Sequence, residues 1–143
     1  MILYRIGNFF YTHRIPFIPK IFDLLIRLIH NSAVFSCCKI GSGTKFAYGS
    51  IAVVIHRRAV IGTSCMIGSC VTIGGKSGSK SVPVIGNNVY IATGAKILGD
   101  ITVGDNCVIG ANAVLINSIP NNTLVAGIPA KILKSDINPK DYY

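Results

Sequence analysis

Aliphatic residues recur every six positions through most of this chain. The series runs Ile55, Ile61, Ile67, Ile73, Ile85, Ile91, Ile97, Val103, Ile109 and Leu115, and only Ser79 interrupts it. Most of these residues are followed, four positions later, by a second apolar residue that is usually small or β-branched: Ala59, Cys65, Val71, Val89, Ala95, Ile101, Cys107, Ala113 and Ile119. Six is not a helical period, so the pattern predicts short strands separated by tight corners.

Each six-residue unit therefore predicts one strand and one corner. Glycine often follows the aliphatic residue, and Asn or Asp lies nearby, which suits corners because these residues tolerate positive φ. Three units close a triangular coil, so that strands of successive coils stack in parallel and the aliphatic side chains fill a prism. An all-β fold, a parallel β-helix over residues 36–133, is the expected architecture. The pattern itself leaves the handedness of the coils open.

Three segments depart from this repeat. The polar, glycine-rich stretch at 75–83 delays the repeat until Ile85, so we expect a loop that protrudes from one corner. Residues 1–35 are expected to form a short N-terminal helical segment, and residues 134–143 a C-terminal tail. In the helical segment Lys20, Asp23, Arg27 and His30 form one polar stripe, and the remaining apolar surface must be covered. Protein contact is favoured over a membrane surface, because two cations on the polar face are few.

The composition argues against several classes of function. The 143 residues suit one domain. The net charge is +9, but the longest basic run is Arg57-Arg58 and no aromatic residues alternate with the scattered basic ones, so nucleic-acid binding is not expected. The chain has no uninterrupted apolar run of about 20 residues, so no membrane span is predicted. No secretory signal is evident either, and a cytoplasmic location is therefore expected.

Metal and disulfide chemistry are not expected either. The five cysteines form no CxxC pair, and all five acidic residues are Asp, so a structural metal site, a disulfide framework and paired-carboxylate catalysis are disfavoured. A carbonic anhydrase built on a similar prism needs three histidines around a metal. Only one of the three histidines, His56, lies within the repeat.

Three sequence motifs resemble the serine acetyltransferase branch of the hexapeptide-repeat acyltransferases: VTIGGKSG at 71–78, IATGAKILG at 91–99 and AGIPAK at 126–131. The resemblance implies a left-handed β-helix and a homotrimer, with acetyl-CoA lying in a groove between adjacent subunits. Matched position by position, it places the cofactor contacts on Gly75, Thr93 and Ala111. It also places the turn at 126–131 near the distal end, where Lys131 is a candidate phosphate contact.

The implied reaction, acetyl transfer from a thioester to an alcohol, needs a base and donors for the developing oxyanion. His13 and His30 lie in the helical segment, where His30 continues the polar stripe and is expected to be solvated. His56 occupies a corner position at which most units carry glycine. The sequence therefore predicts His56 as the catalytic base.

The chain departs from the family's pattern at three positions. The family's usual catalytic histidine aligns near Gly49, its carboxylate partner near Ala33, and a second histidine aligns with Val82. The acceptor is therefore left open between L-serine and a sugar hydroxyl of a surface polysaccharide. The alternative is a catalytically silent trimeric CoA-binding scaffold. Because only about 35 residues precede the coils, in place of the family's larger helical domain, a plain trimer is predicted.

Overall fold

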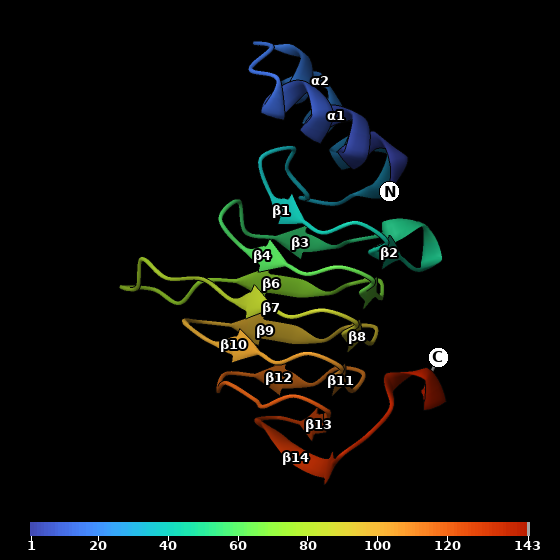
Figure 1. The fold of residues 1–143 in the computed structure, drawn as a ribbon. Helices are drawn as coiled ribbons and strands as arrows, with labels where there is room; N and C mark the ends of the chain where they lie inside the picture. The colour runs from blue at the N-terminus through green and yellow to red at the C-terminus, as the bar shows by residue number, and fades with distance from the viewer. Residues whose placement is uncertain (143) are drawn as a thin grey trace.

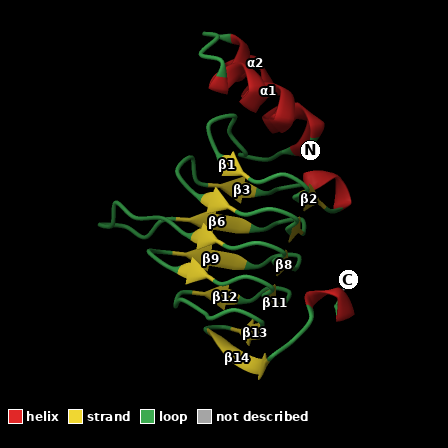
Figure 2. Ribbon diagram, in the orientation of Figure 1, coloured by secondary structure: helices red, strands yellow, loops and turns green. Residues whose placement is uncertain are grey.

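A computed structural model describes residues 1–142, which form a helical hairpin stacked on one end of a parallel β-helix (Figure 1). The hairpin contains α1 (Ile2–Thr12) and α2 (Ile18–His30). Below it the chain winds as short strands and loops, with two short 3-10 turns, η1 (Tyr48–Ser50) and η2 (Pro139–Asp141) (Figure 2). The hairpin closes one end of the β-helix, and the last strands lie at the other end.

The strands form three sheets, one for each side of a prism. The first sheet contains β1 (Lys39–Ile40), β4 (Val60–Ile61), β7 (Val84–Ile85) and β10 (Thr102–Val103). The second contains β2 (Lys45–Phe46), β5 (Met66–Ile67), β8 (Tyr90–Ile91), β11 (Val108–Ile109), β13 (Thr123–Gly127) and β14 (Ala130–Ser135). The third contains β3 (Val54–Ile55), β6 (Thr72–Gly74), β9 (Lys96–Leu98) and β12 (Val114–Leu115). The named strands pair in parallel except β13 with β14, and the predicted left-handed parallel β-helix is confirmed.

The residues that the six-residue period marks as inward-facing fill the prism. Every member of the aliphatic series from Ile55 to Leu115 is at most 2% exposed. The second, smaller series is also buried, with Ile119 the most exposed member at 7%. Burying one such aliphatic side chain contributes about 1.5–3 kcal/mol, so the stacked side chains supply most of the driving force for folding.

Three corners join the sheets, and we number them in chain order: the first corner joins the first sheet to the second, the second joins the second to the third, and the third joins the third back to the first. Asparagines adopt positive φ at the first corner and bond to one another. Asn88 donates from Nδ2 to Asn106 Oδ1 at 2.8 Å, and Asn106 donates to Asn122 Oδ1 at 3.0 Å. This ladder explains why Asn recurs near the corner glycines.

The chain leaves the regular coil at two corners. Val60 pairs with Val84, whereas Val54 pairs with Thr72, so the coil that contains 75–83 is longer by six residues. This segment projects from the third corner between β6 and β7 (Figure 1). The other departure, at η1 on the second corner, lies before Ile55, where the regular series of aliphatic residues begins. Its three residues all have positive φ, from 50° to 70°.

Helix α1 covers the open end of the first coil. The buried hydroxyl of Tyr4 donates to Cys38 O at 2.7 Å and accepts from Ile40 N at 3.2 Å. Burial raises the pKa of Tyr4 to about 12. Arg5 adds bonds from its guanidinium to the carbonyls of Ile40 and Gly41. These bonds fix the hairpin to the prism at a defined orientation.

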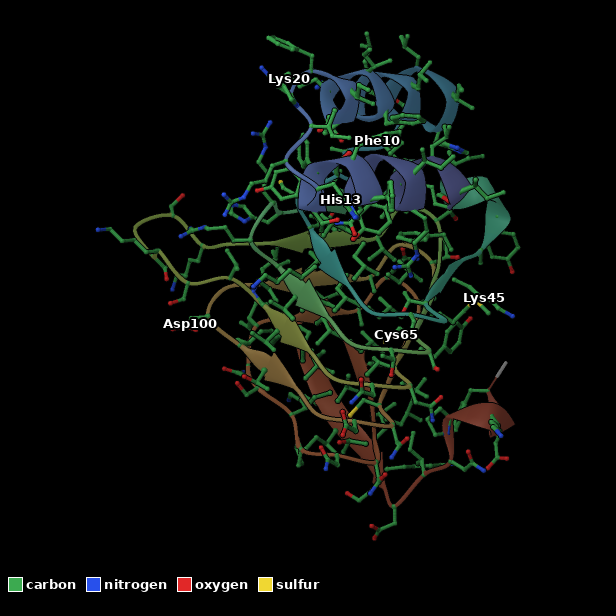
Figure 3. The ribbon with its side chains drawn as sticks, turned by 45° about the horizontal axis from the view of Figure 1, so that its top comes forward. Phe10, His13, Lys20, Lys45, Cys65 and Asp100 are labelled. Carbon is green, nitrogen blue, oxygen red and sulfur yellow. The ribbon has the colours of Figure 1, made fainter. Side chains whose placement is uncertain are left out.

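Helix α2 packs against α1 on one side, and Phe10 lies between the two helices (Figure 3). Its ring centroid is 6.2 Å from that of Phe22. Leu24, Leu28 and Ile29 remain 56%, 71% and 64% exposed. Protein is expected to cover the apolar surface of this helix. Within residues 1–142, α1 covers one side of it, and the other side stays exposed.

Close stacking at the first corner leaves no space for a side chain at Gly62. A Cβ there would lie 2.6 Å from the carbonyl carbon of Gly86, whereas a Cβ on Gly74 would lie 3.6 Å from its nearest neighbour, a methyl of Leu98. We therefore expect Gly62→Ala to lower the free energy of unfolding by about 1–3 kcal/mol. Gly74→Ala is the matched control, with a change below about 0.5 kcal/mol in urea unfolding. Equal effects of the two substitutions would contradict the close stacking.

Candidate active site along the second corner

Four residues stack in a straight line on the second corner, and we call Ile51, Ser69, Thr93 and Ala111 the corner column. Backbone bonds of 2.9 Å connect the first three members to the following coil: Cys70 N to Ile51 O, Gly94 N to Ser69 O, and Asn112 N to Thr93 O. Successive members are therefore about 4.8 Å apart, the spacing of neighbouring strands. Because Gly110 N bonds to Val125 O at 2.8 Å, the turn at 126–131 continues the line beneath Ala111.

The lower part of the corner column is exposed. Thr93 and Ala111 are both exposed, and their small side chains leave the backbone accessible to a narrow ligand. Lys96 donates from Nζ to Cys70 O at 2.6 Å, which fixes a positive charge beside the column. Lys131 is exposed on β14, next to the lower end. The column thus offers a strip of backbone with cations beside it and below it.

The third corner carries the other two predicted site residues. His56 is half-buried, and its Nδ1 accepts a hydrogen bond from Arg58 N at 3.1 Å. A neutral imidazole that accepts at Nδ1 carries its hydrogen on Nε2. Gly75 follows β6 directly, one coil below His56, because His56 N bonds to Ile73 O. His56 and Gly75 are therefore neighbours on this edge.

The two groups of predicted residues lie on opposite edges of the third sheet. One strand, β6, separates the corners, and the four-residue step from Val71 to Gly75 spans about 13 Å. A single chain therefore brings together Thr93, Ala111 and the turn at 126–131, but it keeps His56 and Gly75 apart from them.

His30 lies at the upper end of the corner column, a position that the repeat pattern does not predict. Its Nδ1 is 2.6 Å from Gly49 O, within the η1 turn. His30 is half-buried at the end of α2 and has a hydrogen-bond partner outside that helix, which the interpretation as a solvated helical residue did not include. The turn that carries the acceptor carbonyl is an insertion in the repeat, and the irregular spacing between Phe46 and Ile55 is the signal that could have revealed it.

The remaining histidine lies away from the corners. His13 follows α1 and bonds through Nδ1 to Phe9 O of the same helix at 2.8 Å (Figure 3). Its ring also packs against that of Phe9, with 4.1 Å between the ring centroids and 35° between the ring planes. His13 thus has local partners on its own helix, in contrast to His30, whose partner Gly49 is 19 residues away.

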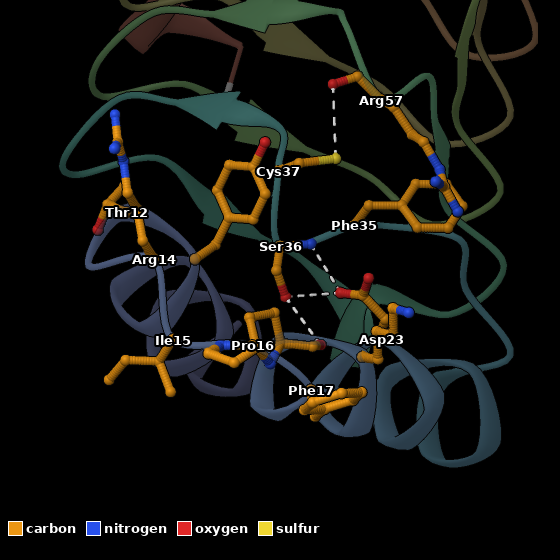
Figure 4. A pocket seen from close by; sticks show the side chains of 13 residues that line it. Thr12, Arg14, Ile15, Pro16, Phe17, Asp23, Phe35, Ser36, Cys37 and Arg57 are labelled. Carbon is orange, nitrogen blue, oxygen red and sulfur yellow. Dashed lines mark hydrogen bonds between the residues drawn. The ribbon is translucent and has the colours of Figure 1, made fainter.

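A cavity of about 790 Å³ lies between the hairpin and the third corner (Figure 4). Arg14, Lys20 and Arg57 contribute positive charge, while Asp23 Oδ1 accepts bonds from the backbone N and Oγ of Ser36 at 2.7 and 2.6 Å. None of the predicted site residues lines it.

The cavity also contains the thiol of Cys37, which lies 3.9 Å from Arg57 O (Figure 4). Burial raises the pKa of this thiol. A thiol with a raised pKa is a poor nucleophile at neutral pH, because the thiolate is the reactive form. Cys37 is therefore a poor nucleophile candidate, and the corners, which carry the predicted site residues, remain the candidate site.

Residues 1–142 contain no group of three or more His, Cys, Asp or Glu side chains arranged to hold a metal ion. Within the same residues, neither helix has the length and apolar character needed to cross a membrane.

Comparisons with known proteins agree with the architecture. Residues 83–117 match the family described as bacterial transferase hexapeptide (six repeats). The chain is 36% identical over 138 residues to a serine acetyltransferase of Helicobacter pylori, covering 95% of this chain and 80% of that protein. It is 34% identical over 135 residues to a serine acetyltransferase of Synechococcus elongatus, covering 93% of this chain and 55% of that protein.

A solved structure is similar over most of the chain. A serine acetyltransferase in complex with CoA superposes with a TM-score of 0.81 at 31% identity, over 92% of this chain and 54% of the solved one. The chain thus spans about half the length of that enzyme and of the cyanobacterial relative.

Proposed function

Because this chain belongs to the serine acetyltransferase family, we propose that it is an acetyl-CoA-dependent O-acetyltransferase that acetylates the hydroxyl of L-serine or of a sugar. The observation that carries the proposal is the corner column. Thr93, Ala111 and the turn at 126–131 lie in one exposed line. A narrow pantetheine arm needs close approach to backbone over such a length, and small corner residues permit it.

The proposed cofactor contacts divide between two subunits of a homotrimer. Thr93 and Ala111 would contact the arm from one subunit, and Gly75 of the next subunit would approach from the third corner. Lys131, exposed at the lower end, would meet the phosphates as a point charge. The division of the predicted contacts between two edges about 13 Å apart supports the groove between adjacent subunits that the resemblance implies.

The bound thioester would supply an activated acetyl group and a thiol leaving group, so the chain itself must supply a base. His56 is the base that the sequence predicts. Its Nδ1 lone pair already accepts from Arg58 N. The neutral ring of His56 therefore presents Nε2–H, a donor suited to a developing oxyanion, and it would accept a proton only after releasing Arg58.

The acceptor remains open between serine and a sugar. The named relatives favour serine. Gly49, Ala33 and Val82, where the resemblance implies other side chains, favour a different acceptor. The same positions motivate the alternative function, a catalytically silent trimeric scaffold that binds CoA. The predicted cytoplasmic location and absence of a metal remain predictions.

The test follows thiol release from acetyl-CoA with L-serine and with free and nucleotide-linked sugars, beside acetyl-CoA binding by calorimetry. We expect turnover with at least one acceptor. Turnover with serine alone makes the chain a serine acetyltransferase, and turnover with a sugar alone makes it a polysaccharide-modifying enzyme. Binding without turnover of any acceptor would favour the scaffold and contradict the proposal. Sedimentation of the same sample tests the trimer.

A further inference from the structure

We infer that His30, supplied by the end of α2, is the general base of this site, an inference that rests on the proposed acetyl transfer. The starting observation is the distance of 2.6 Å between His30 Nδ1 and Gly49 O. A backbone carbonyl can only accept, so Nδ1 carries the hydrogen. In the neutral ring, Nε2 then presents a lone pair. This is the tautomer that a general base requires.

The backbone of His30 is held against the second corner by further bonds. Its carbonyl accepts from Ala52 N at 3.1 Å. Two residues later, Ser32 Oγ accepts from Val53 N at 2.9 Å and bonds to the carbonyl of Ser50. The end of α2 is thus fixed to the η1 turn on both sides of the imidazole bond. Such support keeps a catalytic group oriented without loss of side-chain entropy during the reaction.

His30 also lies in line with the proposed cofactor contacts. The carbonyl of Gly49 is two residues before Ile51, the first member of the corner column. Thr93 is two coils further along, at about 10 Å from Ile51, and Ala111 is one coil beyond it. With Lys131 at the lower end, the reactive end of a bound donor would point towards His30. His30, the corner column and Lys131 then define one direction for the ligand.

The other two histidines lack this combination. His56 has the opposite tautomer, because its Nδ1 accepts from Arg58 N. His13 shares the tautomer of His30, but its partner is Phe9 O of α1, and it bonds to no corner of the prism within residues 1–142. The geometry therefore selects His30 as the base and leaves His56 as a donor on the third corner.

The proposed step balances without any further reactant. His30 Nε2 accepts the hydroxyl proton of the acceptor while the hydroxyl oxygen forms a bond to the thioester carbonyl carbon. The C–S bond then breaks, and the proton on Nε2 passes to the departing sulfur. The products are an O-acetyl ester and a free thiol, and His30 returns to its neutral form.

The substitution His30→Asn separates the base from the structural bond. An asparagine amide lies where Nδ1 lies and can still donate to Gly49 O, but it has no group at the position of Nε2. We expect kcat to fall by about 10²–10⁴-fold, with the Kd of acetyl-CoA changed less than about twofold and the melting temperature unchanged. His13→Asn is the matched control, because it also replaces a carbonyl-bonded histidine beside a helix end, and it should retain full kcat.

A second readout excludes a merely structural role. In His30→Ala, free imidazole should restore part of the turnover, as it replaces the missing base; it should have no such effect on His13→Ala. If wild type is active and His30→Asn retains kcat within about threefold, the inference is overturned and the proposed function stands. If wild type acetylates no acceptor, the proposed function fails first, and the assignment of His30 as a base fails with it.

Discussion

Replacing Ile91 with alanine is expected to lower the free energy of unfolding by about 3 kcal/mol. Ile91 is fully buried on β8, in the middle of the second sheet, between Ile67 of β5 and Ile109 of β11. The prism is only as wide as its inward side chains, and the coils above and below are fixed by backbone bonds. The surroundings cannot collapse into the cavity that Ile91→Ala would leave, so most of the free-energy cost of that cavity remains.

The measurement is denaturant unfolding followed by circular dichroism, with two companion variants. Ile91→Val should cost about 1 kcal/mol, since it removes one methyl group. Val84→Ala removes an outward side chain that is 43% exposed and should cost less than about 0.5 kcal/mol. Equal costs for Ile91→Ala and Val84→Ala would contradict the assignment of the six-residue series to the core.

The repeat pattern was sufficient to predict the prism because every unit satisfies the same local constraints. An inward aliphatic residue, a small inward residue and a corner that tolerates positive φ recur together, and only a stacked coil accommodates all three. Asn88 and Asn106 show that the corner residues meet the same constraints in successive units, since each adopts positive φ and bonds to the next coil. The handedness came from the resemblance, because the period is the same for either hand.

The position of His30 could not be predicted in this way. The spacing of the polar stripe on α2 indicates which face of the helix is polar, but it carries no information on the group that lies opposite. Here that group is Gly49 O, in a turn of three residues inserted between β2 and β3. Tyr4 presents the same difficulty, because its partners Cys38 and Ile40 are more than 30 residues away. Non-local polar contacts of this kind require coordinates.

The resemblance places candidate cofactor contacts on residues of this chain, but it does not say how those residues lie relative to one another in space. Gly75 lies beside His56 on the third corner, whereas Thr93 and Ala111 lie on the second. The same assignment on a single chain would leave the ligand with contacts along one edge only. The proposed groove between two subunits would resolve this, and it would make cofactor binding and assembly dependent on each other. A variant that blocks one edge can therefore distinguish a loss of cofactor binding from a loss of assembly.

Ala111→Trp is expected to weaken acetyl-CoA binding by about 10–100-fold, or about 1.4–2.7 kcal/mol, because an indole on the corner column would prevent close approach of the pantetheine arm. Ala111 is exposed, so stability should change by less than about 0.5 kcal/mol. Calorimetry measures the Kd, and sedimentation of the same variant shows whether the assembly is intact. Ser42→Trp places the same ring on the exposed first corner and should leave the Kd unchanged. An unchanged Kd in Ala111→Trp would exclude the corner column as the cofactor site, whereas weak binding with an intact assembly would locate the acetyl donor along it.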